Sequence, residues 1–212
     1  MGYENAETIR SSKVIKQLTE LEVVQQNGTD IKYFKNPSLS VQLAAVMKDG
    51  YAITYINDPS EEVQLASVKY DGWVIKHLKN PSLAVQLEAV KQNDWCIRAI
   101  KDPSLEAQLI AVKSDGSLIN YIIDSSLEVQ LEAVKQNGLS IQYINDPSVA
   151  VQLEAVKQNS HAIEYVNKLD IEFIEICSKE YIRYKDQVGD LEYFLSEDSI
   201  SSEVKDILRE IK

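Results

Sequence analysis

The five prolines of this chain fall on a single grid with a period of 22 residues. They are Pro37, Pro59, Pro81, Pro103 and Pro147. Ser125 occupies the one vacant position of the grid, and five of the seven glycines repeat at the same interval. A fixed period of this length indicates a tandem array of small structural units, so the sequence predicts a repeat protein rather than one compact globule.

The repeating unit can be written PSxxVQLxAVxx[DN]GxxIxYIx[DN], with the proline as position 1. Units that start at 37, 59, 81, 103, 125 and 147 match this pattern, and a degenerate unit over 15–36 keeps only its second half. We expect an N-terminal cap over 1–14, a repeat region over 15–168 and an acidic C-terminal cap over 169–212. The sequence favours helices near 170–186 and 201–211 in that last segment.

Each unit predicts two short helices. An Asp or Asn precedes the proline, which is typical of an N-cap followed by proline in the first turn, and Glu61 follows Asp58 at capping-box spacing. The first helix then runs about 11 residues to an Asp/Asn-Gly pair, whose glycine supplies a left-handed turn. Because Asp94 and Ser160 replace that glycine, we expect local strain there. A second helical segment of about seven residues follows, for which we expect a single α-turn plus 3₁₀ geometry.

The fold class that follows is all-α: an α-α solenoid of about seven 22-residue helix-turn-helix repeats with helical end caps. The helical wheel of the first helix places positions 3, 7 and 10 (Leu83, Leu87, Val90) in one buried arc, which Val85 and Ala89 extend. Position 17 is isoleucine in every unit, so a hydrophobic spine is expected there. This column consists of Ile31, Ile53, Ile75, Ile97, Ile119, Ile141 and Ile163.

A glutamine at position 6 interrupts the apolar pattern of the first helix. A buried amide costs about 1–3 kcal/mol unless it is hydrogen-bonded. We therefore expect a structural ladder, in which each glutamine bonds to backbone groups of an inter-helix turn or of the neighbouring unit. A glutamine row that contacts a ligand is the alternative. The six residues are Gln42, Gln64, Gln86, Gln108, Gln130 and Gln152.

Composition and charge exclude several classes of function. With 33 acidic and 22 basic residues the net charge is −11, which disfavours tight binding of duplex DNA or of an anionic membrane. No stretch approaches 18 apolar residues and the N-terminus lacks a signal-peptide core, so we expect a cytoplasmic protein without membrane contact. Two cysteines and two histidines are too few for a disulfide framework or a Cys/His zinc site. No metal and no cofactor are therefore expected.

The sequence holds none of the common catalytic motifs. It has no Gly-rich phosphate loop, no HExxH, no GxSxG and no CxxC. His77 and His161 occupy different positions of their units, four repeats apart. Cys96 and Cys177 lie in apolar surroundings and are expected to be buried thiols. We therefore do not expect an enzyme.

The exposed positions that vary between units provide the candidate binding residues. On the second segment these are positions 15, 18, 19 and 21, where two adjacent units combine a tryptophan with cationic side chains. The residues are Trp73, Lys76, His77, Lys79, Trp95, Arg98 and Lys101. One interpretation is that the aromatic rings cover the seam between repeats. The other is an aromatic–basic binding patch that takes an acidic peptide segment or a nucleic-acid strand.

The PSxxVQLxAVxx[DN]G unit resembles the short two-helix repeats of HEAT-like and leucine-rich-variant solenoids. It is most similar to a PSxxVQLAAVxxNG repeat of bacterial and phage proteins, and the resemblance covers 37–168. The resemblance implies a superhelical scaffold with a concave surface for another macromolecule, and no catalytic or ligand residue is implied. The iron–sulfur segment of some leucine-rich-variant proteins has no counterpart here, because this chain has no cysteine cluster.

These observations favour a non-catalytic protein-interaction scaffold or adaptor, a monomer or weak dimer, that presents a rigid curved surface to another protein. The first alternative is an acidic, phage-encoded inhibitor of a nucleic-acid-processing or defence enzyme, because 169–212 holds 12 acidic and 6 basic residues. The second alternative is a HEAT-like nucleic-acid binder, which the net charge disfavours.

Overall fold

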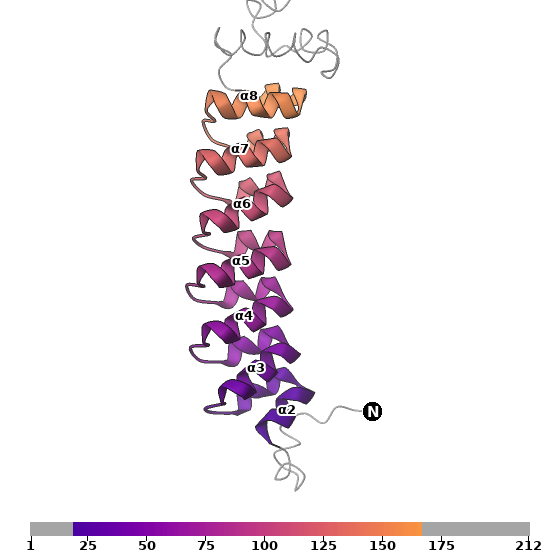
Figure 1. Ribbon diagram of the computed structural model, residues 1–212, viewed down its shortest axis with the longest axis vertical. Helices are drawn as coiled ribbons and strands as arrows, with labels where there is room; N and C mark the ends of the chain where they lie inside the picture. The colour runs from indigo at the N-terminus through magenta and orange to yellow at the C-terminus, as the bar shows by residue number, and fades with distance from the viewer. Residues whose placement is uncertain (1–18, 167–212) are drawn as a thin grey trace, which may run out of the picture. The chain divides into compact units, whose positions relative to one another are not determined.

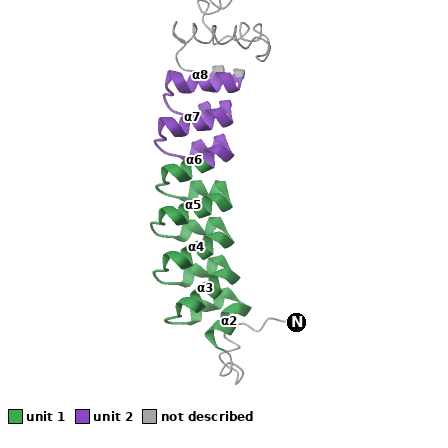
Figure 2. Ribbon diagram, in the orientation of Figure 1, with its two compact units in different colours: residues 1–110 green, residues 111–212 purple. Residues whose placement is uncertain are grey.

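A computed structural model of the chain describes residues 19–166, without the side chains of Ser160 and Ile163. All regular elements over 19–166 are helices, so the prediction of an all-α solenoid of helix-turn-helix repeats is confirmed. The caps expected over 1–14 and 169–212, and Cys177, lie outside the described residues. The chain divides into two compact units, residues 1–110 and residues 111–212 (Figure 2). We call these unit 1 and unit 2.

Each complete repeat consists of an α-helix of ten residues followed by a 3₁₀-helix of six. The α-helices are α2 (Glu20–Gln26), α3 (Leu39–Lys48), α4 (Glu61–Tyr70), α5 (Leu83–Gln92), α6 (Leu105–Ser114), α7 (Leu127–Gln136) and α8 (Val149–Gln158). The 3₁₀-helices are η2 (Gly28–Tyr33), η3 (Gly50–Tyr55), η4 (Gly72–His77), η5 (Asp94–Ala99), η6 (Gly116–Tyr121), η7 (Gly138–Tyr143) and η8 (Ser160–Tyr165). The second helical segment is therefore 3₁₀ in every described repeat.

Within each unit the helices form two layers. In unit 1, α2 to α5 pack consecutively, and so do η2 to η5; in unit 2, α7 packs on α8, and η6 to η8 pack consecutively. The turns that lead from each 3₁₀-helix to the next α-helix lie along one edge of the unit, at the left of Figure 1. We call this the turn edge. Each repeat thus presents a 3₁₀-helix and a turn in a fixed place relative to its neighbours in the same unit.

The prediction of the α-helix N-cap is wrong by two residues. In α5 the cap is Ser82, which has extended backbone and whose Oγ accepts a hydrogen bond from the N–H of Val85 at 3.4 Å. Four of the six residues predicted as caps, Asp58, Asn80, Asp124 and Asp146, instead adopt left-handed backbone with φ of 48–50°. Asp and Asn tolerate this conformation better than other residues with a side chain. Their recurrence before the proline therefore reflects the turn, not the cap.

The predicted capping box at Glu61 is also absent. Glu61 begins α4, and its carboxylate accepts a hydrogen bond from the hydroxyl of Ser82 in the next repeat. A complete capping box occurs at α2, where the Thr19 side chain accepts from the N–H of Glu22 and the Glu22 carboxylate accepts from the N–H of Thr19. The degenerate first unit thus begins its helix with a different device.

The recurring glycine serves close packing and not a left-handed turn. No glycine over 19–166 has a positive φ, and the preceding residue caps the 3₁₀-helix, as Asp71 does by accepting from the N–H of Trp73 at 2.9 Å. A Cβ on Gly116 would lie 2.3 Å from the carbonyl oxygen of Ala133 in the next repeat. The five 3₁₀-helices that begin with glycine therefore start against the backbone of the following α-helix. The strain expected at Asp94 is not found, because its φ is not positive.

The buried face of the α-helix is turned away from the predicted arc. Val85, Ala89 and Val90 are at most 1% exposed, but Leu83 is 47% exposed because it is the first residue of its helix. The same position is exposed in the other repeats that hold an aliphatic residue there: Leu39, Leu105, Leu127 and Val149. The isoleucine column is confirmed in the residues whose side chains are described. Ile31, Ile53, Ile75, Ile97, Ile119 and Ile141 are each at most 3% exposed.

Candidate interaction surface

The threefold period of the 3₁₀-helix determines which side chains reach solvent. With three residues per turn, positions 14 and 17 lie in one row, and positions 15 and 18 lie in another. In η4 the first row holds Gly72 and Ile75, which are buried. The second row holds the half-buried Trp73 and the exposed Lys76, and Lys79 follows in the turn. The aromatic ring and both ammonium groups of this repeat therefore lie on its outward side.

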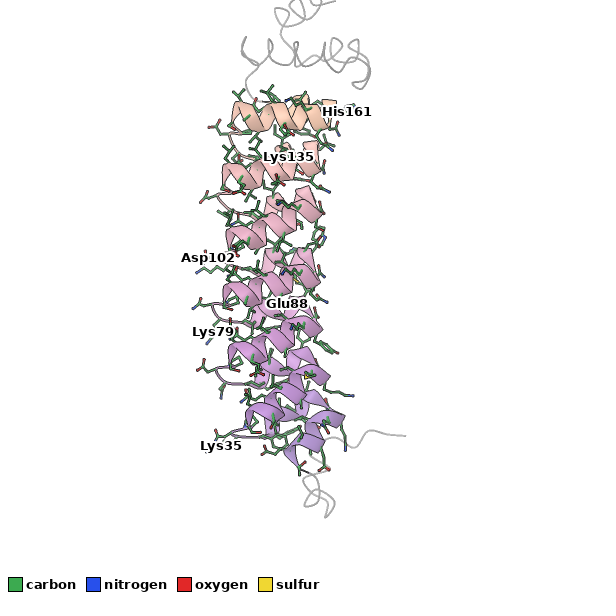
Figure 3. All side chains as sticks on the ribbon, viewed as in Figure 1. Lys35, Lys79, Glu88, Asp102, Lys135 and His161 are labelled. Carbon is green, nitrogen blue, oxygen red and sulfur yellow. The ribbon has the colours of Figure 1, made fainter. Side chains whose placement is uncertain are left out.

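The next repeat places its predicted residues in the same way. Trp95 is 40% exposed at the start of η5, Arg98 is exposed one 3₁₀ turn later, and Lys101 is exposed in the following turn. Six residues of 3₁₀-helix span about 12 Å. Position 15 lies at the start of the helix and position 21 in the turn beyond its end. Figure 3 shows Lys35 and Lys79, both at position 21, along the turn edge of unit 1. The predicted residues therefore cross the whole width of the 3₁₀ layer rather than forming one tight cluster.

Tyr51 links two repeats within this surface. The Nζ of Lys76 lies 5.8 Å from the centroid of the Tyr51 ring, and the His77 ring meets Tyr51 edge-on with centroids 5.8 Å apart. Burial raises the pKa of Tyr51, and its hydrogen bond to the Asp71 carboxylate raises that pKa further. The sequence analysis missed Tyr51, although it stands at position 15, the position of Trp73 in the next repeat.

Lys32 makes a second contact of the same kind. Its Nζ lies 4.9 Å from the centroid of the Tyr33 ring and 5.9 Å from that of Tyr55 in the following repeat. At these distances the ammonium group is attracted by the negative face of each ring. Lysines at position 18 and aromatic rings at positions 15 and 19 thus contact each other both within and between repeats of unit 1.

The equivalent positions of unit 2 have a different chemistry. In the repeats that start at 103 and 125, positions 18 and 21 hold uncharged residues: Asn120, Ile123, Gln142 and Asn145. These four side chains help to line a cleft of about 660 Å³ beside the turn after η6. Ile123 is 85% exposed. In these two repeats the 3₁₀ layer therefore lacks the cations that it carries in unit 1.

The glutamines at position 6 contact the turn of their own repeat. Each donates a hydrogen bond from Nε2 to the carbonyl oxygen of the residue at position 1, over distances of 2.7–3.2 Å. Gln86 also accepts a bond from the N–H of Ser104 in the next repeat, at 2.8 Å. Five of these side chains are half-buried and Gln152 is buried. These bonds satisfy backbone groups that the turn leaves unpaired.

A second set of glutamines, which the sequence analysis missed, connects neighbouring repeats. Gln92, Gln136 and Gln158 end their α-helices and accept a hydrogen bond from the N–H of the glycine that starts the previous 3₁₀-helix. The distances are 2.9 Å to Gly72, 2.7 Å to Gly116 and 2.6 Å to Gly138. The signal in the sequence is the recurring Lys-Gln-Asn at the end of each of these helices.

The remaining reactive side chains do not gather into a site over residues 19–166. No group of three His, Cys, Asp or Glu residues that could hold a metal ion occurs there. Cys96 is fully buried, and burial together with Asp71 and Asp94 raises the pKa of its thiol to about 12. His161 lies in unit 2, where its Nδ1 is 3.8 Å from Oε1 of Glu164.

No helix in the described part is both long enough and apolar enough to cross a membrane. The chain matches no known protein family, no curated protein and no solved structure.

Proposed function

We propose that this protein is a non-catalytic interaction scaffold, and that the 3₁₀ layer of unit 1 is the surface that contacts a protein partner. One observation carries the proposal. Positions 9 and 17 hold small or aliphatic residues that are buried wherever the side chain is described, whereas positions 15 and 18 are half-buried or exposed and change from repeat to repeat. In unit 1 these changing positions combine aromatic rings with cations, as Trp73 and Lys76 do in η4.

The composition of this surface is that of a binding hot spot. Tryptophan, tyrosine and arginine dominate the energy of protein interfaces because they bury a large area and retain a polar group. Trp95 and Arg98 supply two of these residue types in one repeat, and Tyr51 supplies the third. Because the side chains stand on packed helices, little conformational entropy is lost on binding, which favours affinity. The likeness of the repeat to HEAT-like units supports the same proposal by analogy alone.

The alternative of an acidic inhibitor depends on 169–212, which lies outside the described residues. The nucleic-acid alternative depends on the same cations as the present proposal, and binding of a single-stranded oligonucleotide tests it. No observation on residues 19–166 favours either of them over a protein partner.

The test is a selection of peptide ligands followed by substitution. Peptides from a display library are selected on the full chain, and their affinity is measured for the wild type and for a variant with Trp73, Lys76, Trp95 and Arg98 changed to alanine. The matched control is Lys69→Ala with Lys91→Ala, which removes two exposed cations from α4 and α5 of the same repeats.

We expect the selected peptides to bind the four-alanine variant at least about tenfold more weakly and the control variant normally. Circular dichroism establishes that both variants keep the helical content of the wild type. Undiminished binding to a folded four-alanine variant would show that the surface lies elsewhere and would overturn the proposal.

A further inference from the structure

The cations of the unit 1 surface lie in two rows that are in register. One row is position 18, on the 3₁₀-helix, and the other is position 21, at the turn edge. The repeats over 15–36, 59–80 and 81–102 each contribute one cation to each row: Lys32 with Lys35, Lys76 with Lys79, and Arg98 with Lys101. All six are exposed, and the intervening repeat over 37–58 has the uncharged Thr54 and Asn57 in these positions.

The stacking of the repeats fixes the spacing of these pairs. Helices η2 to η5 pack consecutively, and packed helices lie about 8–10 Å apart. The pair at Lys32 and the pair at Lys76 are two repeats apart, which corresponds to about 18 Å. The pair at Arg98 follows one repeat later, after about 9 Å. The positive charge therefore follows an uneven pattern across the repeats, with a longer and a shorter interval.

We infer that unit 1 binds an acidic segment of a partner protein in extended conformation, laid across the repeats with its carboxylates opposite the three cation pairs. This inference rests on the proposed function and names its ligand. An extended chain advances about 3.3 Å per residue, so about 18 Å corresponds to five or six residues and about 9 Å to three. The ligand thus carries acidic residues at position n, at n+5 or n+6, and at n+8 or n+9.

The uncharged repeat determines what lies between the first two acidic residues. There positions 15 and 19 are Tyr51 and Tyr55, and the lysines of the flanking repeats, Lys76 and Lys32, lie against these rings. A ligand that follows the surface passes over two aromatic rings before it reaches the next pair of cations. Apolar or aromatic side chains fit this interval, because they bury ring surface without placing a carboxylate next to an aromatic face.

The pattern favours a peptide over a nucleic acid. A polynucleotide carries one negative charge at every nucleotide and cannot omit the charge opposite the tyrosines. Asp102 also lies at the turn edge directly after Lys101, Asp58 follows Asn57 in the uncharged repeat, and the net charge of the chain is −11. An evenly charged backbone meets these repulsions along its whole length, whereas a peptide places its carboxylates only opposite the cations.

The experiment compares two synthetic peptides of identical composition in fluorescence anisotropy titrations of the full-length chain. The matched peptide has glutamates at n, n+6 and n+9 with tyrosine and small residues between them, and the mismatched peptide has the three glutamates adjacent. A single-stranded oligonucleotide is the third ligand. The variants are Lys76→Glu with Lys79→Glu, and as control Lys69→Glu with Lys91→Glu, which makes the same change of charge on the α-helix layer.

We expect the matched peptide to bind about tenfold more tightly than the mismatched one, since three exposed ion pairs together contribute about that factor. We also expect the affinity to be lost in the Lys76/Lys79 variant, kept in the control, and weakened by salt. Equal binding of the two peptides would overturn the inferred spacing but not the scaffold. If neither acidic peptide binds while library-selected peptides do, the acidic ligand is overturned and the proposed scaffold function stands. Tighter binding of the oligonucleotide would overturn the inference in favour of a nucleic acid.

Discussion

Replacing Gly116 with alanine tests why a glycine recurs at the start of the 3₁₀-helices. The backbone there is not left-handed, so alanine fits its φ, and the smaller freedom of the unfolded chain alone would stabilise the protein by about 0.4–1 kcal/mol. The new Cβ would, however, lie 2.3 Å from the carbonyl oxygen of Ala133, where ordinary contacts begin near 3.4 Å. The next α-helix must move by about 1 Å, and overpacking of this kind costs about 1–3 kcal/mol. We expect a net loss of about 1–2 kcal/mol.

The assay is urea unfolding followed by circular dichroism at the helix band, with the midpoint compared between variants. Gly50→Ala is the matched control, because its Cβ would meet the nearest carbonyl oxygen at 2.9 Å rather than 2.3 Å, and we expect a smaller loss. Gly116→Asn separates the two explanations. Asparagine tolerates left-handed backbone but still has a Cβ, so close packing predicts that it is at least as destabilising as alanine. An asparagine variant as stable as the wild type would refute the packing argument.

Further predictions concern the assigned buried face, the buried hydroxyl of Ser140 and the buried thiol of Cys96. Ile75→Ala should lower the free energy of unfolding by about 2–5 kcal/mol, because its side chain is buried, and the exposed Leu83→Ala by less than about 1 kcal/mol. If urea unfolding gave equal losses for the two variants, the assigned buried face would be wrong. Ser140→Ala should raise stability by about 1 kcal/mol, since the fully buried Oγ has no hydrogen-bond partner over 19–166; a loss in the same assay would show that the hydroxyl is satisfied. The Cys96 pKa of about 12 exceeds the ordinary 9.0, so the unfolded chain loses this proton first, and the thiol's contribution to stability is full below pH 9 and declines above it. In a Cys177→Ser background, Cys96 should resist a thiol reagent at pH 8 until urea is added, and rapid labelling of the folded protein would contradict its burial.

The repeat architecture was predictable because its signal is redundant. The proline grid, the isoleucine column and the alternation of two helical segments all specify the same 22-residue unit, and an error at one position leaves the period intact. The residue at position 17 is buried wherever its side chain is described, as at Ile97. The 3₁₀ geometry of the second segment was expected in part, since about seven residues are too few for a stable α-helix, but the α-turn expected beside it is not found in the described repeats.

The details of the turns were not predictable from the same evidence. Asn-Pro-Ser suits both a cap at the asparagine and a left-handed turn followed by a cap at the serine, and local preferences do not distinguish these two arrangements. Because α5 begins at Leu83 and not at Pro81, that leucine is the first residue of the helix and is exposed. Likewise, an Asn-Gly pair satisfies both a left-handed turn and a close approach of two backbones. Only the position of Ala133 in the next repeat shows that the second applies to Gly116.

Contacts between repeats account for the residues that were missed. Gln136 pairs with the N–H of Gly116, 20 residues earlier, and a pattern read within one unit does not reveal such a partner. Tyr51 contacts Lys76 and His77 of the following repeat for the same reason. The seven predicted binding residues lie on the 3₁₀-helices and turns of unit 1. The tryptophans single out two adjacent repeats, and the pattern within a unit does not connect them with Lys32 of η2 and Tyr51 of η3.

The intrinsic fluorescence of the two tryptophans tests the central claim most directly, because Trp73 and Trp95 are the only tryptophans in the chain and both lie in the proposed surface. Titration with a tryptophan-free acidic peptide of matched spacing should change their emission saturably, at the same concentrations at which anisotropy reports binding. The Lys76→Glu, Lys79→Glu variant should show no such change, whereas the Lys69→Glu, Lys91→Glu variant should behave as the wild type. A peptide that binds by anisotropy but leaves the tryptophan emission unaltered would contradict the claim that the 3₁₀ layer of unit 1 is the interaction surface.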